Sequence, residues 1–272
     1  MNRILIRVVG APLLLAALAG CLFLDQHSKY PIAITVVLAL FAAVSLHELC
    51  SMARLKGMRP AEAVGIVAVL LSYMPWLGIK APWLSLEVTA LATTGAVLLL
   101  LVIRYRDFTP LDAGYTMFAF GYVSLLQFVL RGAPDDPGHR LLWLLFLLAA
   151  NKGSDMAAYV AGKLAGRHKM APSISPNKTW EGAIAGLVGG TLLGGWALAG
   201  LKDASPHTIV LAVALAVTVA AQVGDLVKSA VKRWAGVKDS GRLLPEFGGA
   251  LDMVDSFILS APVAAVLVDL LL

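Results

Sequence analysis

Acidic residues stand in the sequence where a long apolar segment begins. Asp252 and Asp255 lie three residues apart in "FGGALDMVDSF", and the apolar run that follows extends to Val268. A carboxylate moved toward hydrocarbon is costly unless it is paired, solvated or bound to a cation. The two acids therefore predict a functional site at the start of this segment.

A third acid belongs to a helical pattern in "VGDLVKSAVKRW". Asp225, Lys228, Ser229 and Lys232 follow the spacing i, i+3, i+4 and i+7, so an acid, an alcohol and two amines share one helix face. Carboxylate oxygens bind hard cations such as Mg²⁺ together with substrate phosphates. Phosphoryl and nucleotidyl transfer depend mainly on such neutralisation and positioning. The sequence contains no Walker motif, Cys/His zinc spacing or Gly-x-Ser-x-Gly nucleophile that would favour another chemistry.

A further polar group lies in "SISPNKTWEG", where a Ser-Pro turn leads to Lys178, Thr179 and an apolar run. The free N–H groups at a helix start are a natural seat for phosphate, and Lys178 adds a full positive charge. Four glycines then recur at four-residue spacing, which predicts close packing against another helix. These are Gly182, Gly186, Gly190 and Gly194.

A polar helix face is also expected in "ANKGSDMAAYVAGK". Asn151, Asp155 and Tyr159 recur every four residues and therefore point the same way. Exposure of this face to lipid would be costly, so we expect it to line the protein interior or a polar cavity.

The composition predicts an all-α, polytopic integral membrane protein. The 272 residues are 59% hydrophobic and 14% charged, with a mean hydropathy of +0.81. About 20 apolar residues span a bilayer, and spanning segments without closed sheets must be helices. The sequence predicts about nine transmembrane helices, at 8–24, 31–49, 61–78, 84–103, 113–130, 141–162, 180–200, 207–227 and 256–272.

The basic residues predict the orientation. With a cytoplasmic N-terminus, sixteen Lys and Arg residues fall in inside loops and five in outside loops, as the positive-inside rule expects. This distribution explains the net charge of +5 without a nucleic-acid partner. We expect one membrane domain, residues 1–272, with an N-terminal helical half (1–140) and a catalytic half (141–272) whose site faces the cytoplasm. His47 and Glu48, in the first half, are interpreted as structural.

The polar segments resemble the phosphatidate cytidylyltransferase family, also called CDP-diacylglycerol synthase. The family signature reads S-x-x-K-R-x-x-x-x-K-D-x-G-x-x-x-P-G-H-G-G-x-x-D-R-x-D-S in outline. The matching residues are Ser229, Lys232, Arg233, Lys238, Asp239, Gly241, Pro245, Gly248, Gly249, Asp252, Asp255 and Ser256. Glu246, Phe247 and Met253 depart from it, while every candidate metal-binding acid remains. The resemblance covers residues 150–272 directly and the first half through hydropathy.

The resemblance implies transfer of the cytidylyl group of CTP to phosphatidate in the inner (plasma) membrane, with release of pyrophosphate. It implies Mg²⁺ held by Asp225, Asp252 and Asp255, suggests a second, monovalent cation such as K⁺, and leaves a homodimer open. Lys232 joins these three acids as a catalytic residue. The remaining substrate-binding residues would be basic groups for phosphates, hydroxyl groups, and two residues that shape the cavity: Lys178, Arg233 and Lys238; Ser175, Thr179 and Ser229; Asp155 and Tyr159.

Alternative functions remain open at this stage. A CTP-dependent kinase of a polyprenol or phytol belongs to a related family and shares the "KTWEG"-like element. A transporter of an anionic substrate would also need lysines and acids in its membrane segments. Basic residues can simply anchor helices at anionic headgroups, but this does not explain three acids at membrane depth.

Overall fold

The computed structural model describes residues 20–21, 23–25, 28, 30–79, 84–133, 136–201, 206–241 and 248–272. Contacts group the chain into two compact units. Unit 1 comprises residues 1–127 and 234–254, and unit 2 comprises residues 128–233 and 255–272. Relative to the expected halves, residues 128–140 thus pack with the second unit and residues 234–254 with the first.

Membrane-spanning helices dominate the fold, as the composition predicts. Among the described residues, seven helices are long and apolar enough to cross a membrane. They are Ile32–Arg54, Leu86–Ile103, Pro110–Arg131, Gly138–Ala165, Trp180–Leu201, His207–Ala235 and Ala250–Leu271. The protein is therefore a polytopic membrane protein. The predicted span at 61–78 is a shorter apolar helix, Glu62–Leu77, and the predicted span at 8–24 lies almost entirely outside the described residues.

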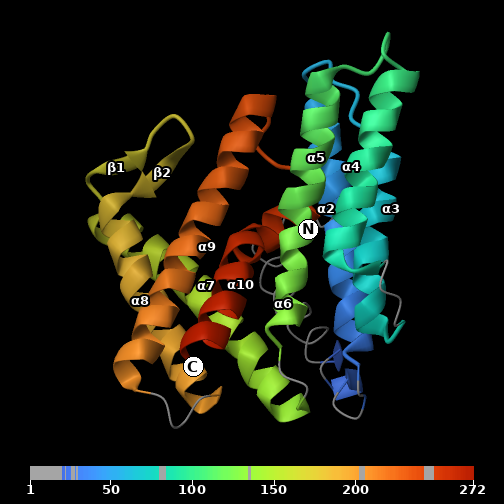
Figure 1. Cartoon of the computed structure of the whole chain (residues 1–272). Coiled ribbons are helices and arrows are strands. Elements are labelled where there is room, and N and C mark those ends of the chain that lie inside the picture. Colours follow the sequence, from blue (N-terminus) through green and yellow to red (C-terminus); the bar gives the residue numbers. More distant parts are fainter. Residues whose placement is uncertain are drawn as a thin grey trace. The chain divides into compact units, whose positions relative to one another are not determined.

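Four helices of unit 1 run side by side (Figure 1). They are α2 (Ile32–Arg54), α3 (Glu62–Tyr73, continued by the 3₁₀ turn η1, Met74–Leu77), α4 (Leu86–Ile103) and α5 (Pro110–Ser124, continued by the 3₁₀ turn η3, Leu125–Gln127). Large side chains such as Leu49, Tyr73 and Phe120 fill the interior. On α4, Leu91 and Val102 are exposed, which is the expected arrangement for a helix that faces lipid.

Carboxylates fix the helix ends of unit 1. Asp25 accepts hydrogen bonds from the N–H groups of Ala33 and Ile34, at the start of α2. Thr109 and Asp112 form a capping box at the start of α5. The second oxygen of Asp112 also accepts from the N–H of Arg59, which ties the loop before α3 to α5. These contacts satisfy backbone groups for which lipid offers no partner.

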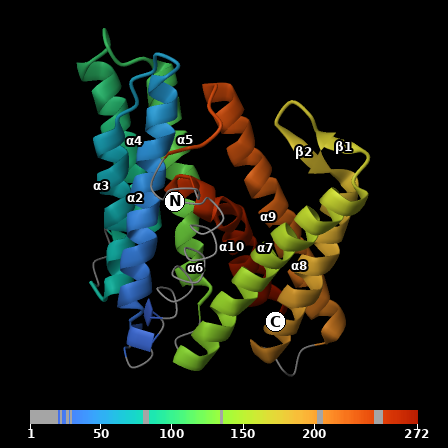
Figure 2. The same cartoon turned by 180° about the vertical axis from the view of Figure 1, so that it is seen from behind.

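Unit 2 contains long helices and a small hairpin (Figure 2). Its elements are α6 (Phe128–Arg131), α7 (Pro137–Ala165), β1 (Lys169–Ala171), β2 (Ser175–Thr179), α8 (Trp180–Leu201), α9 (His207–Ala235) and α10 (Ala250–Leu271), the last two of which begin or end in unit 1. Strands β1 and β2 pair antiparallel, an arrangement that the sequence did not predict. Asp136 caps α7, and the hydrogen bond from the His139 N–H lowers the pKa of the Asp136 carboxyl from its usual value.

The glycine stripe of α8 packs against α7, as predicted. A Cβ atom at Gly182 would lie 2.8 Å from the Ala158 carbonyl oxygen, and one at Gly190 would lie 2.6 Å from that of Ala150. Both distances are too short for any side chain. The two backbones approach closely because the intervening positions carry no side chain.

Helices α9 and α10 extend beyond the predicted spans. Helix α9 continues from the predicted end at 227 to Ala235, and α10 begins at Ala250 instead of 256. Lys228 and Lys232 are therefore helical, and Asp252 and Asp255 lie in the first two turns of α10. Periodicity of apolar residues marks the part of a helix that crosses lipid, not its polar extension.

A buried carboxylate from α2 holds the start of α10 within unit 1. Glu48, which is 5% exposed, accepts hydrogen bonds from the N–H groups of Ala250 (2.8 Å) and Leu251 (3.0 Å) and from the Ser240 hydroxyl (2.8 Å). Glu48 thus caps the free N–H groups and the positive dipole at the start of α10, although it lies some 200 residues earlier in the sequence. The structural interpretation of Glu48 is confirmed.

Replacement of Glu48 by alanine should destabilise the protein, because three donors lose a charged acceptor. We expect a loss of about 3 kcal/mol in unfolding free energy, or roughly 6 °C in melting temperature, for the detergent-purified protein. Glu87→Ala, which changes an exposed acid in the first turn of α4, is the matched control and should change stability by less than about 1 kcal/mol. Equal melting temperatures for the two variants would contradict this role of Glu48.

Candidate active site

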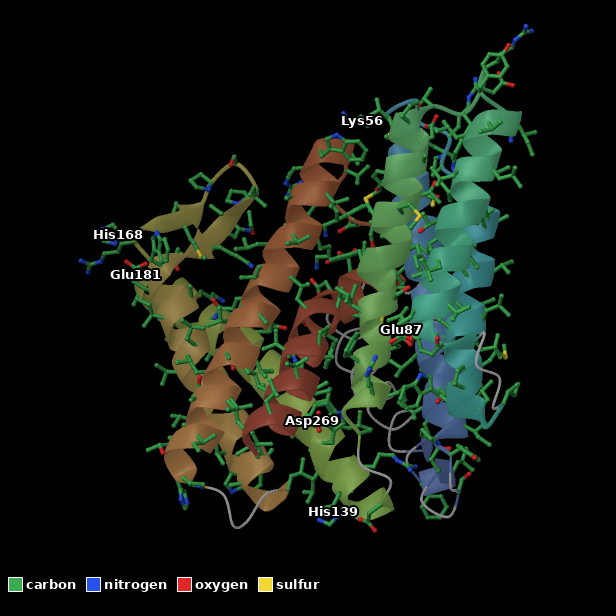
Figure 3. All side chains as sticks on the ribbon, in the orientation of Figure 1. Lys56, Glu87, His139, His168, Glu181 and Asp269 are labelled. Carbon is green, nitrogen blue, oxygen red and sulfur yellow. The ribbon has the colours of Figure 1, made fainter. Side chains whose placement is uncertain are left out.

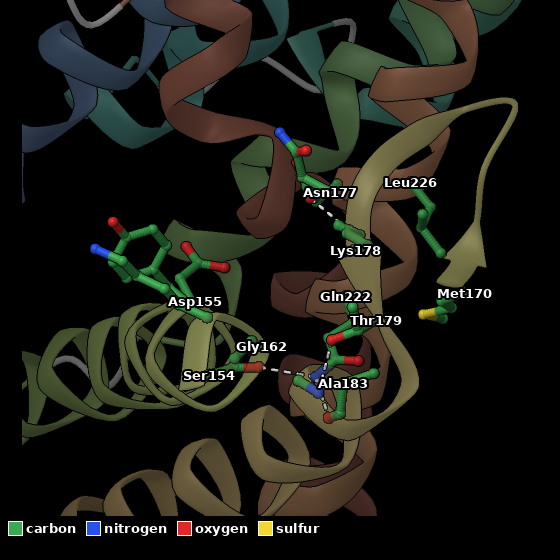
Figure 4. Close-up of a pocket in the computed structure, with 15 residues that line it drawn as sticks. Ser154, Asp155, Gly162, Met170, Asn177, Lys178, Thr179, Ala183, Gln222 and Leu226 are labelled. Atoms are coloured by element: carbon green, nitrogen blue, oxygen red, sulfur yellow. Dashed lines mark hydrogen bonds and ion pairs between the residues drawn. The ribbon is translucent and has the colours of Figure 1, made fainter. Parts of the chain in front are cut away.

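Unit 2 contains a cavity of about 470 Å³ between helices α7, α8 and α9 and the hairpin. Figure 4 shows Ser154, Asp155 and Gly162 from α7, Lys178 and Thr179 from β2, and Gln222 and Leu226 from α9 around it. Tyr159, Lys163, Asn177 and Asp225 also line it. Four residues predicted for the site from separate segments, Asp155, Tyr159, Lys178 and Thr179, are thus brought together with Asp225.

A chain of alternating charges begins at this cavity. Lys178 Nζ lies 2.5 Å from Asp225 Oδ2, and Lys228 Nζ lies 3.1 Å from Asp225 Oδ1. Lys228 also forms an ion pair with Asp255 Oδ2. Exposure falls along the chain, from 28% and 29% for the Lys178 and Asp225 side chains to 8% and 6% for Lys228 and Asp255. The four charges balance, which is what burial of ions requires.

Local sequence explains why these charges meet. Asp225 and Lys228 are one helical turn apart on α9. Gly224 lets α10 approach α9, since a Cβ atom there would lie 2.7 Å from the Asp255 carbonyl oxygen. Lys178 is placed by β2, and the turn that joins the two strands is tied to α9 because Arg233 Nε donates to the Ile174 carbonyl oxygen at 3.0 Å.

The start of α8 was expected to seat a phosphate. Within the structure, the Thr179 hydroxyl accepts from the Gly182 N–H at 3.2 Å, and the Trp180 N–H donates to the His168 carbonyl oxygen. Glu181 pairs with the His168 ring at 2.6 Å, and Figure 3 shows the two side chains together beside the hairpin. Part of the helix start is therefore served by the protein itself, and Lys178 is the charged group of this segment that reaches the cavity.

Asp252 belongs to a different hydrogen-bond network, in unit 1. Its Oδ2 atom accepts from the Ser240 N–H and hydroxyl, both at 3.0 Å, and from the Gly249 N–H at 3.3 Å. The last contact is the backward half of a capping box. Ser240 also donates to Glu48, so Asp252, Ser240 and Glu48 hold the segment before α10 together.

The other predicted residues lie around these groups. Ser229 and Lys232 are half-buried on α9, one and two turns beyond Asp225, and Arg233 is exposed. Ser175 begins β2, and Lys238 is exposed in unit 1, in the segment after α9. Met253 lies on α10, whereas Glu246 and Phe247 fall outside the described residues. The substrate roles of these side chains stay predictions.

Sequence reasoning missed several residues of the cavity, among them Gln222 and Lys163. Gln222 donates to Ser154 Oγ at 3.1 Å and to the Ala183 carbonyl oxygen at 3.0 Å, and so links α9 to α7 and α8. Lys163 lies over the Tyr159 ring, 5.8 Å from its centre. Spacing could have identified both, since Gln222 precedes Asp225 by three residues and Lys163 follows Tyr159 by four.

The expected polar face of α7 divides between two surroundings. Asp155 and Tyr159 line the cavity, and Asp155 pairs with Lys152 at 3.2 Å. Asn151 is fully buried, where it donates to the Leu147 carbonyl oxygen and accepts from the Ser260 hydroxyl. Both outcomes agree with the prediction, since Asp155 and Tyr159 line a cavity and Asn151 lies in the interior.

The acids of unit 2 fit a hard cation by their chemistry. Among the residues that the structure describes, no group of three or more His, Cys, Asp or Glu side chains forms a ready metal centre. The carboxylates of Asp225 and Asp255 nevertheless lie close together, because both pair with the ammonium group of Lys228. One or two carboxylates together with substrate phosphates are the usual Mg²⁺ ligands.

Spanning helices with a charged cavity beside paired acids and lysines define a polytopic membrane protein with a polar site in unit 2. Residues 2–271 match the Cytidylyltransferase family. The phosphatidate cytidylyltransferase of Staphylococcus aureus (strain COL) is 32% identical over 257 residues, which cover 93% of this chain and 96% of that protein. The phosphatidate cytidylyltransferase of Brucella suis biovar 1 (strain 1330) is 39% identical over 190 residues, 68% of each chain. The protein therefore belongs to the cytidylyltransferase family and is a nucleotidyltransferase by that membership.

Close approach at Gly224 provides a test of the site architecture. Gly224→Ala places a methyl group against the backbone of α10, and overpacking of this kind costs about 1–3 kcal/mol. We expect a lower melting temperature. Gly95→Ala on α4, where a Cβ atom meets no atom within 4 Å, is the control and should leave the melting temperature unchanged or raise it. A fall of equal size in both variants would contradict the close approach.

Proposed function

We propose that this protein is a phosphatidate cytidylyltransferase, which converts CTP and phosphatidate to CDP-diacylglycerol and pyrophosphate. The observation that carries the proposal is the Lys178–Asp225 pair at the cavity, joined through Lys228 to Asp255. Phosphate groups need lysine charges, and the accompanying cation needs carboxylates. The names of these relatives, phosphatidate cytidylyltransferases, support the same reaction.

The reaction needs alignment more than acid–base catalysis. A phosphate oxygen of phosphatidate, already anionic near neutral pH, attacks the α-phosphorus of CTP. A new P–O bond forms, the bond from the α-phosphorus to the bridging oxygen breaks, and pyrophosphate leaves with that electron pair. Lys178 would hold phosphate oxygens in the cavity, and Lys232 and Arg233 would neutralise charge from the end of α9.

Mg²⁺ is the proposed cofactor, with Asp225 and Asp255 as its ligands. When bound, the ion would supply charge neutralisation at the transferred phosphate. The protein residues set the geometry: α9 carries Asp225, the contact at Gly224 brings up Asp255, and Glu48 and Ser240 hold the start of α10.

Sidedness follows from the substrates and from the basic residues. CTP is a cytosolic anion and phosphatidate lies in the membrane leaflet, so the site must be reached from both. We propose that the N-terminus and the cavity face the cytoplasm, because sixteen of the basic residues then lie in inside loops.

An assay of purified protein with CTP, Mg²⁺ and phosphatidate tests the function. We expect pyrophosphate and CDP-diacylglycerol in equal amounts. Phosphorylation of a polyprenol or phytol instead would identify a lipid kinase. If neither CDP-diacylglycerol nor a phosphorylated alcohol forms, transport of an anionic substrate is the remaining alternative.

A second experiment tests the sidedness. In sealed vesicles, CTP added outside should react only when the cytoplasmic face is outward. Reaction of CTP only in vesicles of the opposite orientation would overturn the sidedness.

Asp225→Asn should lower turnover at least about a hundredfold, or roughly 2.7 kcal/mol of transition-state stabilisation. The amide removes an anionic ligand and a partner of Lys178, so the Mg²⁺ dependence should shift to higher concentration. Asp107→Asn is the control, since Asp107 forms an exposed ion pair with Arg59 in unit 1 and should tolerate the change within about twofold. Near-normal turnover of Asp225→Asn with an unshifted Mg²⁺ curve would remove Asp225 from the site.

A further inference from the structure

One ammonium group in unit 2 is shared by two carboxylates. Lys228 Nζ contacts Asp225 Oδ1 at 3.1 Å and also pairs with Asp255 Oδ2. The Lys228 and Asp255 side chains are 8% and 6% exposed. Few lysines are buried this deeply unless their charge is paired. This residue therefore has a defined electrostatic role.

Two carboxylates at one site repel each other, and either a bound cation or a shared proton relieves the repulsion. A cation supplied from solution would meet this need, as the second, monovalent ion expected from the family resemblance would. In this chain the ammonium of Lys228 already occupies that place. It carries the same single charge as K⁺ and is delivered by the helix that also carries Asp225.

The two lysines of the cluster differ in their access to substrate. Lys178 lines the cavity and its side chain is 28% exposed, so its ammonium group can leave Asp225 and pair with a substrate phosphate instead. Lys228 is far less exposed and is held by both acids. When Lys178 turns to a phosphate, Lys228 still balances one of the two carboxylate charges. This leaves one net negative charge on the pair of acids for a divalent ion.

We propose that Lys228 is a built-in monovalent cation: its ammonium takes the place of a bound K⁺ between Asp225 and Asp255, so that the protein needs a divalent ion but no monovalent one. The catalytic part of this inference rests on the proposed function. The electrostatic part concerns the folded protein alone, and can be measured without substrate.

The first arm of the test uses the wild-type protein. Melting temperature in detergent, and CDP-diacylglycerol formation with Mg²⁺ present, are measured in potassium chloride and in choline chloride of equal ionic strength. Both should be the same in the two salts, within about twofold for the rate. A tenfold or larger loss of rate without K⁺, or a melting temperature that K⁺ raises, would overturn the proposal.

The second arm removes the ammonium group of Lys228 by substitution. Lys228→Gln should melt at a lower temperature than wild type in choline chloride, and potassium chloride should raise it, because the vacated site between two carboxylates can take up the ion. Its rate in choline chloride should fall at least tenfold. Lys228→Arg should stay independent of K⁺. Lys152→Gln, which breaks the exposed pair with Asp155 at the same spacing of three residues, should show no K⁺ response.

The two arms separate failure of the inference from failure of the function. If wild type forms no CDP-diacylglycerol in either salt, the proposed function fails and the melting temperatures still decide the role of Lys228. If Lys228→Gln melts as wild type does, or melts lower without any response to K⁺, the ammonium is not a substitute for a bound cation and the inference is overturned.

Discussion

The pairing of buried carboxylates with donors inside the chain is the constraint on which this structure depends. A charge in an apolar environment loses its hydration, and only close opposite charges or hydrogen bonds compensate for that loss. Lys228 meets this requirement for Asp255, whose side chain is 6% exposed. Because both partners are short of water, α9 and α10 must approach closely where they carry these residues, and Gly224 makes that approach possible. The ion pair and the close approach at Gly224 thus act together where the two helices meet.

The same constraint operates in unit 1 with neutral donors. Asp25, Glu48 and Asp112 each accept from backbone N–H groups at or before a helix start. In water, such groups would be solvated at small cost, and the caps would add little. In a membrane protein each unsatisfied group is expensive, and in unit 1 these three acids supply acceptors at or before helix starts. Acids in apolar sequence therefore have two roles here: pairing with a lysine in unit 2 and capping helix starts in unit 1. The partner of each acid, rather than its position in the sequence, identifies its role.

The sequence predicted the features that depend on periodicity and composition. Helical spans, the packing stripe on α8, and the polar face of α7 follow from spacing alone, and Asp225 with Lys228 follows from i, i+3 on α9. It could not predict contacts between distant segments. Glu48 is separated from Ala250 by about 200 residues, and nothing in "SLHELC" indicates which helix start it serves. The hairpin was missed because its strands are short and polar, with neither the apolar alternation of a strand nor the period of a helix.

Charge balance in the cluster bears on how a nucleotide could bind. Lys178, Asp225, Lys228 and Asp255 sum to zero, so these four groups by themselves offer no net attraction to a triphosphate. A nucleotide that binds together with a divalent ion supplies a cation to the carboxylates and phosphate groups to Lys178. Each charged group then exchanges one partner of opposite charge for another, so the charges remain balanced. Free CTP would instead compete with Asp225 for Lys178 and leave a carboxylate with one partner fewer. For the proposed reaction, the electrostatics thus favour the metal complex of the nucleotide over the nucleotide alone, because buried charge is costly to leave unpaired.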